Sequence, residues 1–300
     1  MRVLVSDPIH EEGIRLLKDF AEVEIATDLT KSGLLERIPS FDAIIVRSGT
    51  TLDKDVIDAA KNLKLIVRAG VGLDNIDLDY AGEEGIRVEN TPEASTNAVA
   101  ELSIAFLLSW SRRIPKAHVL MKGGKWEKSK LGGSEIRGKT IGIVGTGRIG
   151  RSVAEKAKAL GMNVLGRDVQ EMDEFYDLGG EYVDLDRLLE KSDYVSLHVP
   201  SDSTTEHLIG QNEFELMKDS AVIINVARGS VIDEEALIEA LREGKIAGAC
   251  LDVYERDPIE DGRLLELDNV ILTPHLGAST EEAQKDVGVL AAKKVKEILG

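Results

Sequence analysis

The chain has little of several features that define large classes of proteins. A single cysteine among 300 residues excludes a disulfide framework within one chain. No basic run offsets the formal net charge of −17, so a nucleic-acid partner is not expected. The most apolar predicted helix, residues 98–110, contains Glu101 and is too short to span a bilayer. Because the N-terminal residues lead directly into a strand pattern, we expect no signal peptide, no membrane association and a cytoplasmic location.

Aromatic side chains are also scarce, at 4 % of the residues, whereas apolar residues make up 43 %. The hydrophobic cores must therefore consist of Val, Ile, Leu and Ala, which is typical of parallel sheets covered by helices. The length of 300 residues suits one large domain or two medium ones. Histidine occurs five times, and no spacing between these histidines matches that of metal ligands, so we expect no metal site.

Short runs of Val, Ile and Leu alternate with helical patterns along the whole chain. A first series occupies the N-terminal third, and a second begins at residues 139–145, after a long helical stretch that starts near Ser95. This alternation predicts an α/β protein with two doubly wound parallel-sheet domains, divided on the long helix. The C-terminal segment 279–300 is predicted to be a helix capped by Ser279 or Thr280.

A glycine-rich loop follows the first predicted strand of the second series. Gly145, Gly147 and Gly150 have G-x-G-x-x-G spacing, between a strand and a helical pattern, which is typical of dinucleotide binding. The pyrophosphate of such a cofactor lies at the N-terminus of the following helix. The next strand ends at Asp168, whose carboxylate would accept hydrogen bonds from ribose hydroxyls and favours NAD. The neighbouring Arg167 leaves NADP open, because a guanidinium can bind the additional phosphate.

Two residues at predicted strand ends are candidates for catalysis. An oxidoreductase that acts on hydroxy acids needs a cation for the substrate, a base for the hydroxyl proton and a carboxylate that orients the base. Arg228 directly follows one predicted strand and His275 follows another, and parallel strands open onto a ligand site at their carboxyl ends. The stretch LDVYERDP offers three carboxylates as the partner of the histidine: Asp252, Glu255 and Asp257.

These motifs make the chain similar to a known family. Over essentially its whole length it resembles the D-isomer-specific 2-hydroxyacid dehydrogenases, and within them a short form without a regulatory C-terminal domain. The segments that carry the resemblance include VRSGTTLDKDVI, RAGVGLDNID, NTPEASTNAVAEL, GKTIGIVGTGRIGR, INVARGSVIDEEALIEAL, GACLDVYERDP and NVILTPHLGAST.

The resemblance implies roles for both domains. Residues 1–94 and 281–300 would form a flavodoxin-like substrate-binding domain, into which a Rossmann dinucleotide-binding domain, 95–280, is inserted. The implied catalytic arginine and histidine are Arg228 and His275. The other implied contacts with NAD lie at Val71, Gly145, Gly147, Arg148, Ile149, Gly150, Asp168, His198, Val199, Pro200, Val226, Ala227, Asp252, Gly277 and Ala278. The implied contacts with the substrate lie at Arg47, Ser48, Val71, Gly72 and Asn97.

The carboxylate that pairs with His275 is a departure from the family pattern. The family has a glutamate immediately before the proline of this stretch, and this chain has Asp257 there, which is shorter by one methylene. Glu255 is the alternative. In an extended segment, however, residues two apart are separated by nearly 7 Å, so Glu255 could take the role only if the loop shifted. We therefore predict that Asp257 is the partner.

The expected activity is NAD-dependent oxidation of D-3-phosphoglycerate to 3-phosphohydroxypyruvate, the first step of serine biosynthesis. Two alternatives stay open. One is reduction of glyoxylate or hydroxypyruvate, or of another D-2-hydroxy acid pair, on the same scaffold. The other, of a different class, is a non-catalytic interaction protein that senses NAD. The resemblance also implies a homodimer, with Trp126 and the lysines beside it near the partner.

Overall fold

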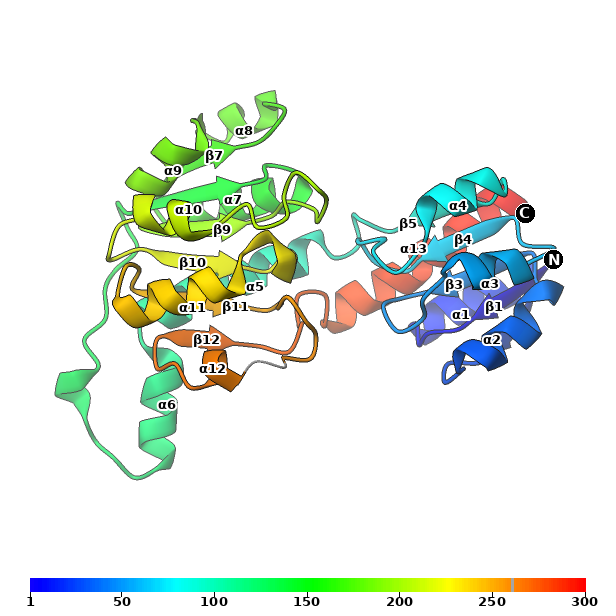
Figure 1. Ribbon diagram of the computed structural model, residues 1–300, viewed down its shortest axis with the longest axis horizontal. Helices are drawn as coiled ribbons and strands as arrows, with labels where there is room; N and C mark the ends of the chain where they lie inside the picture. Colours follow the sequence, from blue (N-terminus) through cyan, green and yellow to red (C-terminus); the bar gives the residue numbers. More distant parts are fainter. Residues whose placement is uncertain (260–261) are drawn as a thin grey trace. The chain divides into compact units, whose positions relative to one another are not determined.

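The computed structural model describes residues 1–259 and 262–300. The chain forms two compact units (Figure 1). The first unit consists of Met1–Thr96 and Ala278–Gly300, and the second consists of Asn97–Gly277. The division predicted from the sequence lay at residues 94/95 and 280/281.

The sheet of the first unit has five parallel strands. Its spatial order, β2-β1-β3-β4-β5, is that of flavodoxin-like folds, in which the order of strand addition reverses between β1 and β3. Because both faces are covered, β3 and β4 are almost entirely buried and apolar. The strands are β1 (Arg2–Val5), β2 (Glu22–Ile25), β3 (Ala43–Val46), β4 (Leu65–Arg68) and β5 (Arg87–Asn90).

Helices cover both faces of this sheet. On one face, α1 (Glu11–Lys18) packs beside the C-terminal helix α13 (Glu281–Leu299), which also contacts β4. The Thr280 hydroxyl accepts a hydrogen bond from Ala283 N and so caps α13, one of the two caps predicted. The opposite face is covered by α2 (Lys31–Arg37), the 3₁₀ turn η1 (Ile38–Ser40), α3 (Lys54–Ala59) and α4 (Leu78–Glu83).

The sheet of the second unit has seven parallel strands in the order β12-β11-β10-β9-β6-β7-β8. From β8 to β11 this is the 3-2-1-4-5-6 order of dinucleotide-binding folds, with the reversal between β6 and β9. Parallel pairing places the carboxyl ends of all these strands along one edge (Figure 1). The strands are β6 (Thr140–Val144), β7 (Asn163–Arg167), β8 (Glu181–Tyr182), β9 (Tyr194–Leu197), β10 (Val222–Asn225), β11 (Gly248–Leu251) and β12 (Val270–Leu272).

The two hydrophobic cores of the second unit lie on the two faces of its sheet. One contains residues of α5 (Thr96–Ser111), α7 (Arg148–Ala159) and α8 (Asp173–Asp177). The other contains residues of α9 (Leu185–Lys191), α10 (Gln211–Leu216), α11 (Glu234–Glu243) and α12 (Gly262–Leu265). The 3₁₀ turn η3 (Gly229–Val231) follows β10. The predicted α/β class with two doubly wound parallel sheets is confirmed.

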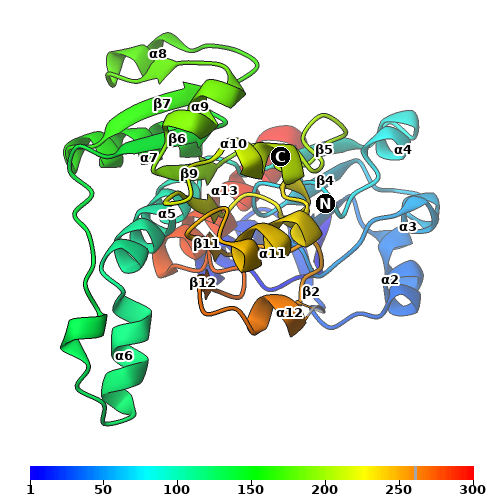
Figure 2. The ribbon, with the colours of Figure 1, turned by 60° about the vertical axis from the view of Figure 1, so that its left-hand side comes forward.

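One part of the second unit was not predicted. Helix α6 (Ile114–Lys122) and the 3₁₀ turn η2 (Lys128–Lys130) form an arm that projects from the sheet (Figure 2). None of the residues of α6 is buried, which explains why its sequence has no clear hydrophobic face. Among the helices within residues 1–259 and 262–300, none combines the length and the apolar character needed to cross a membrane.

Candidate active site

The glycine loop between β6 and α7 has the backbone geometry that a pyrophosphate requires. Gly145 has φ of 93°, and a Cβ there would lie 2.6 Å from the carbonyl oxygen of His198. A Cβ at Gly150 would lie 2.0 Å from the carbonyl oxygen of Gly145. A Cβ at Gly147, by contrast, would meet nothing within 4 Å, so the space in front of this N-cap residue is open. The loop and the N-terminus of α7 therefore fit a dinucleotide pyrophosphate, with Arg148 and Ile149 in the first turn.

Asp168 follows β7 on the same edge of the sheet. Its Oδ2 atom accepts hydrogen bonds from the backbone N of Thr146, at 2.6 Å, and from the hydroxyl of Thr146, at 3.1 Å. Its Oδ1 atom accepts from the backbone N of Val169 at 2.7 Å. The carboxylate is therefore fixed next to the glycine loop. A guanidinium nitrogen of Arg167 donates to the backbone oxygen of Asp168, which holds this arginine against its own chain.

The segment after β9 borders the glycine loop. The backbone N–H of His198 donates to the carbonyl oxygen of Val144. The Nε2 atom of its ring lies 2.8 Å from the hydroxyl of Ser196. Burial of the ring lowers the pKa of His198 to about 3, so the imidazole is neutral. Val199 and Pro200 are the next two residues of this segment. Their predicted contact with the cofactor stays a prediction.

Asn225, the last residue of β10, shapes the turn that carries Arg228. The buried side chain of Asn225 accepts from the backbone N of Ala227 at 3.0 Å and donates to the backbone oxygen of Arg228 at 2.9 Å. The guanidinium of Arg228 donates to the oxygen of Ala227 at 2.7 Å. The predicted cofactor-contact residues Val226 and Ala227 lie within this turn. Asn225 was not predicted as a site residue, although its place directly before V-A-R at a strand end was a usable signal.

Asp252, after β11, connects three strand ends. Its backbone N donates to the backbone oxygen of Asn225, and its own backbone oxygen accepts from the backbone N of His275 at 3.0 Å. Its buried carboxylate accepts from the backbone N of Leu276 and of Gly277, each at 2.7 Å, and also from the Thr273 hydroxyl. Both carboxylate oxygens thus hold the loop of His275, which has a left-handed φ of 54°. The predicted contact of Asp252 with the nicotinamide amide is a second role that stays a prediction.

His275 pairs with Asp257. The Nδ1 atom of His275 lies 2.9 Å from Oδ2 of Asp257, and the two side chains are 55 % and 42 % exposed. Glu255 has a different partner: its Oε1 atom lies 2.9 Å from Nε2 of His207 and also accepts from the backbone N of Glu234. Asp257 therefore pairs with His275, whereas Glu255, the alternative that the sequence offered, pairs with His207.

A close approach of two chains joins the arginine turn to the loop of Asp257. A Cβ at Gly229 would lie 1.8 Å from the carbonyl oxygen of Tyr254, so only glycine fits there. The Tyr254 hydroxyl donates to the carbonyl oxygen of Thr273 at 2.8 Å. Burial raises the pKa of Tyr254 to about 12, which keeps this hydroxyl neutral and able to donate. The turns after β10, β11 and β12 are therefore held against one another.

In the first unit, the predicted substrate residues follow β3 and β4. Asp7 accepts from the backbone N of Arg47 and of Thr50, and its Oδ1 atom lies 3.0 Å from the hydroxyl of Thr50. Asn75 donates to the backbone oxygen of Arg47 at 2.6 Å. Burial lowers the pKa of Arg47, although a guanidinium remains charged at neutral pH. Asp7 and Asn75, which were not predicted, fix this loop, and Ser48 is exposed on it.

The remaining predicted residues lie on other loops of their own units, except Asn97, which lies in the first turn of α5. The backbone oxygen of Val71, next to Gly72, accepts from the side chain of Asn90 at 2.6 Å. In the second unit, Asn97 donates to Glu101 at 2.7 Å and accepts from Lys156 at 2.8 Å. The backbone oxygen of Ala278 accepts from Gln284 at 2.6 Å. Their predicted contacts with cofactor or substrate stay predictions.

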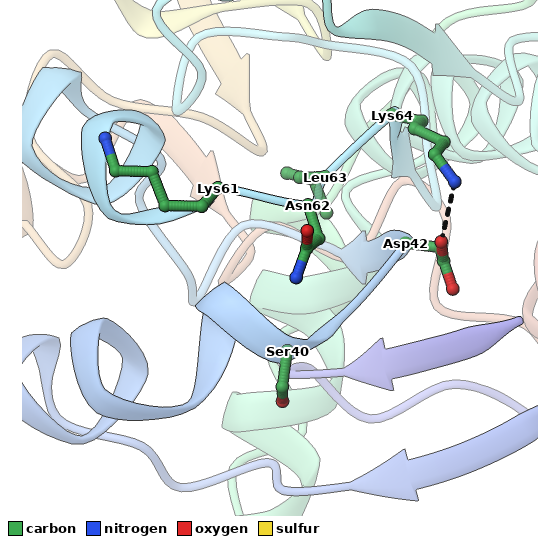
Figure 3. Close-up of a pocket in the computed structure, with 6 residues that line it drawn as sticks. All are labelled: Ser40, Asp42, Lys61, Asn62, Leu63 and Lys64. Carbon is green, nitrogen blue, oxygen red and sulfur yellow. Dashed lines mark hydrogen bonds and ion pairs between the residues drawn. The ribbon is translucent and has the colours of Figure 1, made fainter.

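A surface hollow in the first unit lies at the opposite edge of its sheet (Figure 3). Its lining residues precede β3 and β4, and they are Ser40, Asp42, Lys61, Asn62, Leu63 and Lys64. Lys64 and Asp42 form an ion pair there, with 2.9 Å between Nζ and Oδ1. Because ligands of open parallel sheets bind at the carboxyl ends of the strands, this hollow is not the candidate site.

The second unit therefore has the fold and the loop of an NAD-binding α/β domain. Comparison with known proteins identifies the family. Residues 104–277 match the model of the D-isomer specific 2-hydroxyacid dehydrogenase, NAD binding domain. The chain belongs to the D-isomer specific 2-hydroxyacid dehydrogenase family, and the cofactor is NAD.

Several relatives are similar over the whole chain. The D-3-phosphoglycerate dehydrogenase of Methanocaldococcus jannaschii is 50 % identical to this chain. The similarity extends over 100 % of this chain and 57 % of that protein. The hydroxypyruvate reductase of Thermotoga maritima is 48 % identical, over 100 % of this chain and 98 % of its own. The structure of D-lactate dehydrogenase from Aquifex aeolicus, complexed with NAD and lactic acid, has a TM-score of 0.89 and 32 % identity, over 100 % and 95 % of the two chains. The chain thus spans little more than half of the phosphoglycerate dehydrogenase it matches.

Proposed function

We propose that the protein is an NAD-dependent D-2-hydroxyacid dehydrogenase that oxidises D-3-phosphoglycerate to 3-phosphohydroxypyruvate. The observation that carries the proposal is the Asp257–His275 pair, which lies on the same sheet edge as Arg228 and the glycine loop. A base with its orienting carboxylate, a cation and a dinucleotide loop are the parts that this reaction needs.

The hydrogen bond between His275 and Asp257 supports Nε2 of His275 as the base. A carboxylate can only accept, so Nδ1 of a neutral His275 carries the hydrogen that it shares with Asp257. The Nε2 atom then has the free lone pair and takes the proton of the substrate hydroxyl. Arg228 binds the substrate carboxylate and the oxygen at C2, where it stabilises the carbonyl that forms. Bound NAD supplies the acceptor for the hydride that leaves C2.

Arg47 is the proposed ligand of the substrate phosphate. It lies on a loop that Asp7 and Asn75 hold in place, so its guanidinium starts from a defined backbone position. We expect Arg47→Gln to raise KM for D-3-phosphoglycerate at least about tenfold, since a charged hydrogen bond to phosphate is worth about 1.5–3 kcal/mol. Lys64→Gln is the matched control, because it removes a cation of the same unit at the opposite sheet edge. Equal effects of both variants on KM would contradict a phosphate site at Arg47.

Reduction of hydroxypyruvate is the second candidate function. It is favoured by the similarity to the hydroxypyruvate reductase of T. maritima, which this chain covers almost completely. The two functions are separated by comparing kcat/KM for D-3-phosphoglycerate with NAD against hydroxypyruvate and glyoxylate with NADH. Arg47→Gln should leave kcat/KM for the unphosphorylated substrates within about threefold of the wild-type value, because these substrates have no phosphate that Arg47 could bind. A threefold change corresponds to about 0.7 kcal/mol, which is less than the energy of a charged hydrogen bond. Turnover of hydroxypyruvate alone would assign the second function.

A homodimer is part of the proposal. The arm of the second unit exposes several large apolar side chains, and exposed apolar surface is typical of protein–protein interaction sites. We expect light scattering to give the mass of two chains, and Trp126→Glu to give that of one. A monomeric wild-type protein would contradict this. The exposed side chains and their exposed fractions are Ile114 (53 %), Val119 (68 %), Met121 (53 %) and Trp126 (80 %).

A further inference from the structure

A chain of hydrogen bonds runs behind the carboxylate of Asp168. The Oδ2 atom of Asp168 lies 3.1 Å from the hydroxyl of Thr146, and this hydroxyl lies 2.7 Å from that of Tyr182. The Tyr182 hydroxyl also accepts from the backbone N of Met172 at 3.1 Å. Three segments of the second unit thus meet behind one carboxylate: the glycine loop, the turn after β7 and strand β8.

The two ends of this chain fix the direction of every hydrogen bond in it. The backbone N–H of Met172 can only donate, and the ionised carboxylate of Asp168 can only accept. The Tyr182 hydroxyl, which accepts from Met172, therefore donates to Thr146, and the Thr146 hydroxyl donates to Asp168. A hydroxyl that accepts one hydrogen bond is a stronger donor in the next, so Tyr182 strengthens the bond that Thr146 makes to the carboxylate.

The side chains around this series of hydrogen bonds are closely packed. Thr146 is completely buried, and its methyl group lies 3.1 Å from the position of a Cβ at Gly166 on β7. The ring of Tyr182 packs against those of Phe175 and Tyr176, with centroid distances of 4.7 and 5.1 Å. In a protein with only 4 % aromatic residues, three aromatic rings gather at this single point. They leave the Tyr182 hydroxyl little freedom to find another partner.

We propose that Thr146 and Tyr182 are positioning residues that hold the Asp168 carboxylate toward the adenosine ribose of the cofactor, and thereby set the preference for NAD over NADP. The inference rests on the ribose contact that the sequence predicts for Asp168. A fixed carboxylate accepts from the 2′-hydroxyl of NAD, and it repels the 2′-phosphate of NADP because it cannot turn away. A carboxylate free to rotate would lose part of both effects.

The test compares the dissociation constants of NADH and NADPH, measured by calorimetry without any substrate. Thr146→Val keeps the methyl group and the shape of the side chain but removes the hydroxyl. We expect it to lower the ratio of the NADPH constant to the NADH constant by about five- to tenfold. This is less than the loss of a whole charge-assisted hydrogen bond, because the backbone N of Thr146 still donates to the same carboxylate oxygen. Thr146→Ser restores the hydroxyl and should keep the ratio within about twofold of the wild-type value, since no hydrogen bond is lost. Tyr182→Phe should lower it by a smaller factor of about two to three, as expected for an indirect effect.

A double-mutant cycle separates this role from a structural one. In the Asp168→Asn background, Thr146→Val should leave the ratio unchanged, because its effect acts through the carboxylate. The proposal is overturned if Thr146→Val weakens both cofactors by the same factor, if Thr146→Ser behaves like Thr146→Val, or if the effect persists without Asp168. Binding is measured in the absence of turnover, so a failure of the proposed substrate activity would not affect these outcomes. An Asp168→Asn variant with the wild-type ratio would overturn the role of Asp168 itself.

Discussion

Replacing Asp257 by Asn removes one negative charge next to the proposed base and changes little else. The side chain keeps its size, and its amide oxygen can still accept from Nδ1 of His275. The charge matters most when His275 has taken the hydroxyl proton, since an imidazolium then lies beside the carboxylate. The loss should therefore fall on the transition state and lower kcat, whereas KM for the substrate should change little.

The distance and exposure of the pair give the expected size of this effect. At 2.9 Å, two unit charges attract by roughly 1.4 kcal/mol in water and by roughly 6 kcal/mol at an effective dielectric constant of about 20. Because the two side chains are about half exposed, the value in water is the better guide. We expect a loss of about 1.4–2.3 kcal/mol, which corresponds to a decrease in kcat of about 10- to 50-fold.

Steady-state kinetics of three variants tests this reasoning. Glu255→Gln is the matched control, because it makes the same chemical change two residues away on a side chain that contacts His207. It should reduce kcat by less than about threefold, in line with an exposed ion pair. Asp257→Glu keeps the charge and should retain most of the activity. If Glu255→Gln reduced kcat more than Asp257→Asn, Glu255 would be the residue that acts on the base.

Three further predictions concern the surroundings of the site. Gly150→Ala should weaken NADH binding at least about tenfold in a calorimetric titration, because its Cβ would lie 2.0 Å from the oxygen of Gly145; wild-type affinity would contradict the tight packing of the loop. The unfolded chain takes up a proton on His198 below its ordinary pKa of 6.5, whereas the folded protein does so only near 3. The free energy of unfolding should therefore decrease as the pH is lowered from 6.5 toward 3. His198→Gln should therefore abolish roughly 2 kcal/mol of the loss in unfolding free energy between about pH 6.5 and 5, measured in urea, and an unchanged slope would refute the burial of a neutral ring. Asp252→Asn should lower the melting temperature by several degrees, since the buried carboxylate accepts from several donors of the His275 loop and the amide replaces one acceptor by a donor; an unchanged melting temperature would contradict this anchoring.

The fold could be predicted because its signals are local. Buried parallel strands are continuous apolar runs, and the alternation of such runs with amphipathic helices is visible without knowledge of contacts. The arm that contains α6 was missed for the opposite reason. Its residues are not buried against the unit that carries it, so no hydrophobic periodicity marks the helix.

The site could be predicted only in part. Arg228, His275 and Asp168 could be selected because each stands within three residues of a strand end, and the parallel topology places these strand ends along one edge. Their roles stay predictions. The separate partners of Asp257 and Glu255 depend on His275 and His207, which lie far from them in the sequence, and on the path of an irregular loop. The link between Thr146 and Tyr182 runs through a strand of only two residues, which has no recognisable pattern.

The structure explains how Asp257, which is one methylene shorter than the glutamate of the family pattern, can reach the ring of His275. His275 has a left-handed backbone, a conformation that costs about 1–3 kcal/mol in a residue other than glycine. Hydrogen bonds from Leu276 and Gly277 to the buried carboxylate of Asp252 hold the loop in this conformation. Asp257 lies instead in an exposed loop outside the sheet, so the register of the strands does not determine its distance from the ring. The strand ends therefore hold the proposed base, and the loop brings the Asp257 carboxylate within hydrogen-bond distance of it.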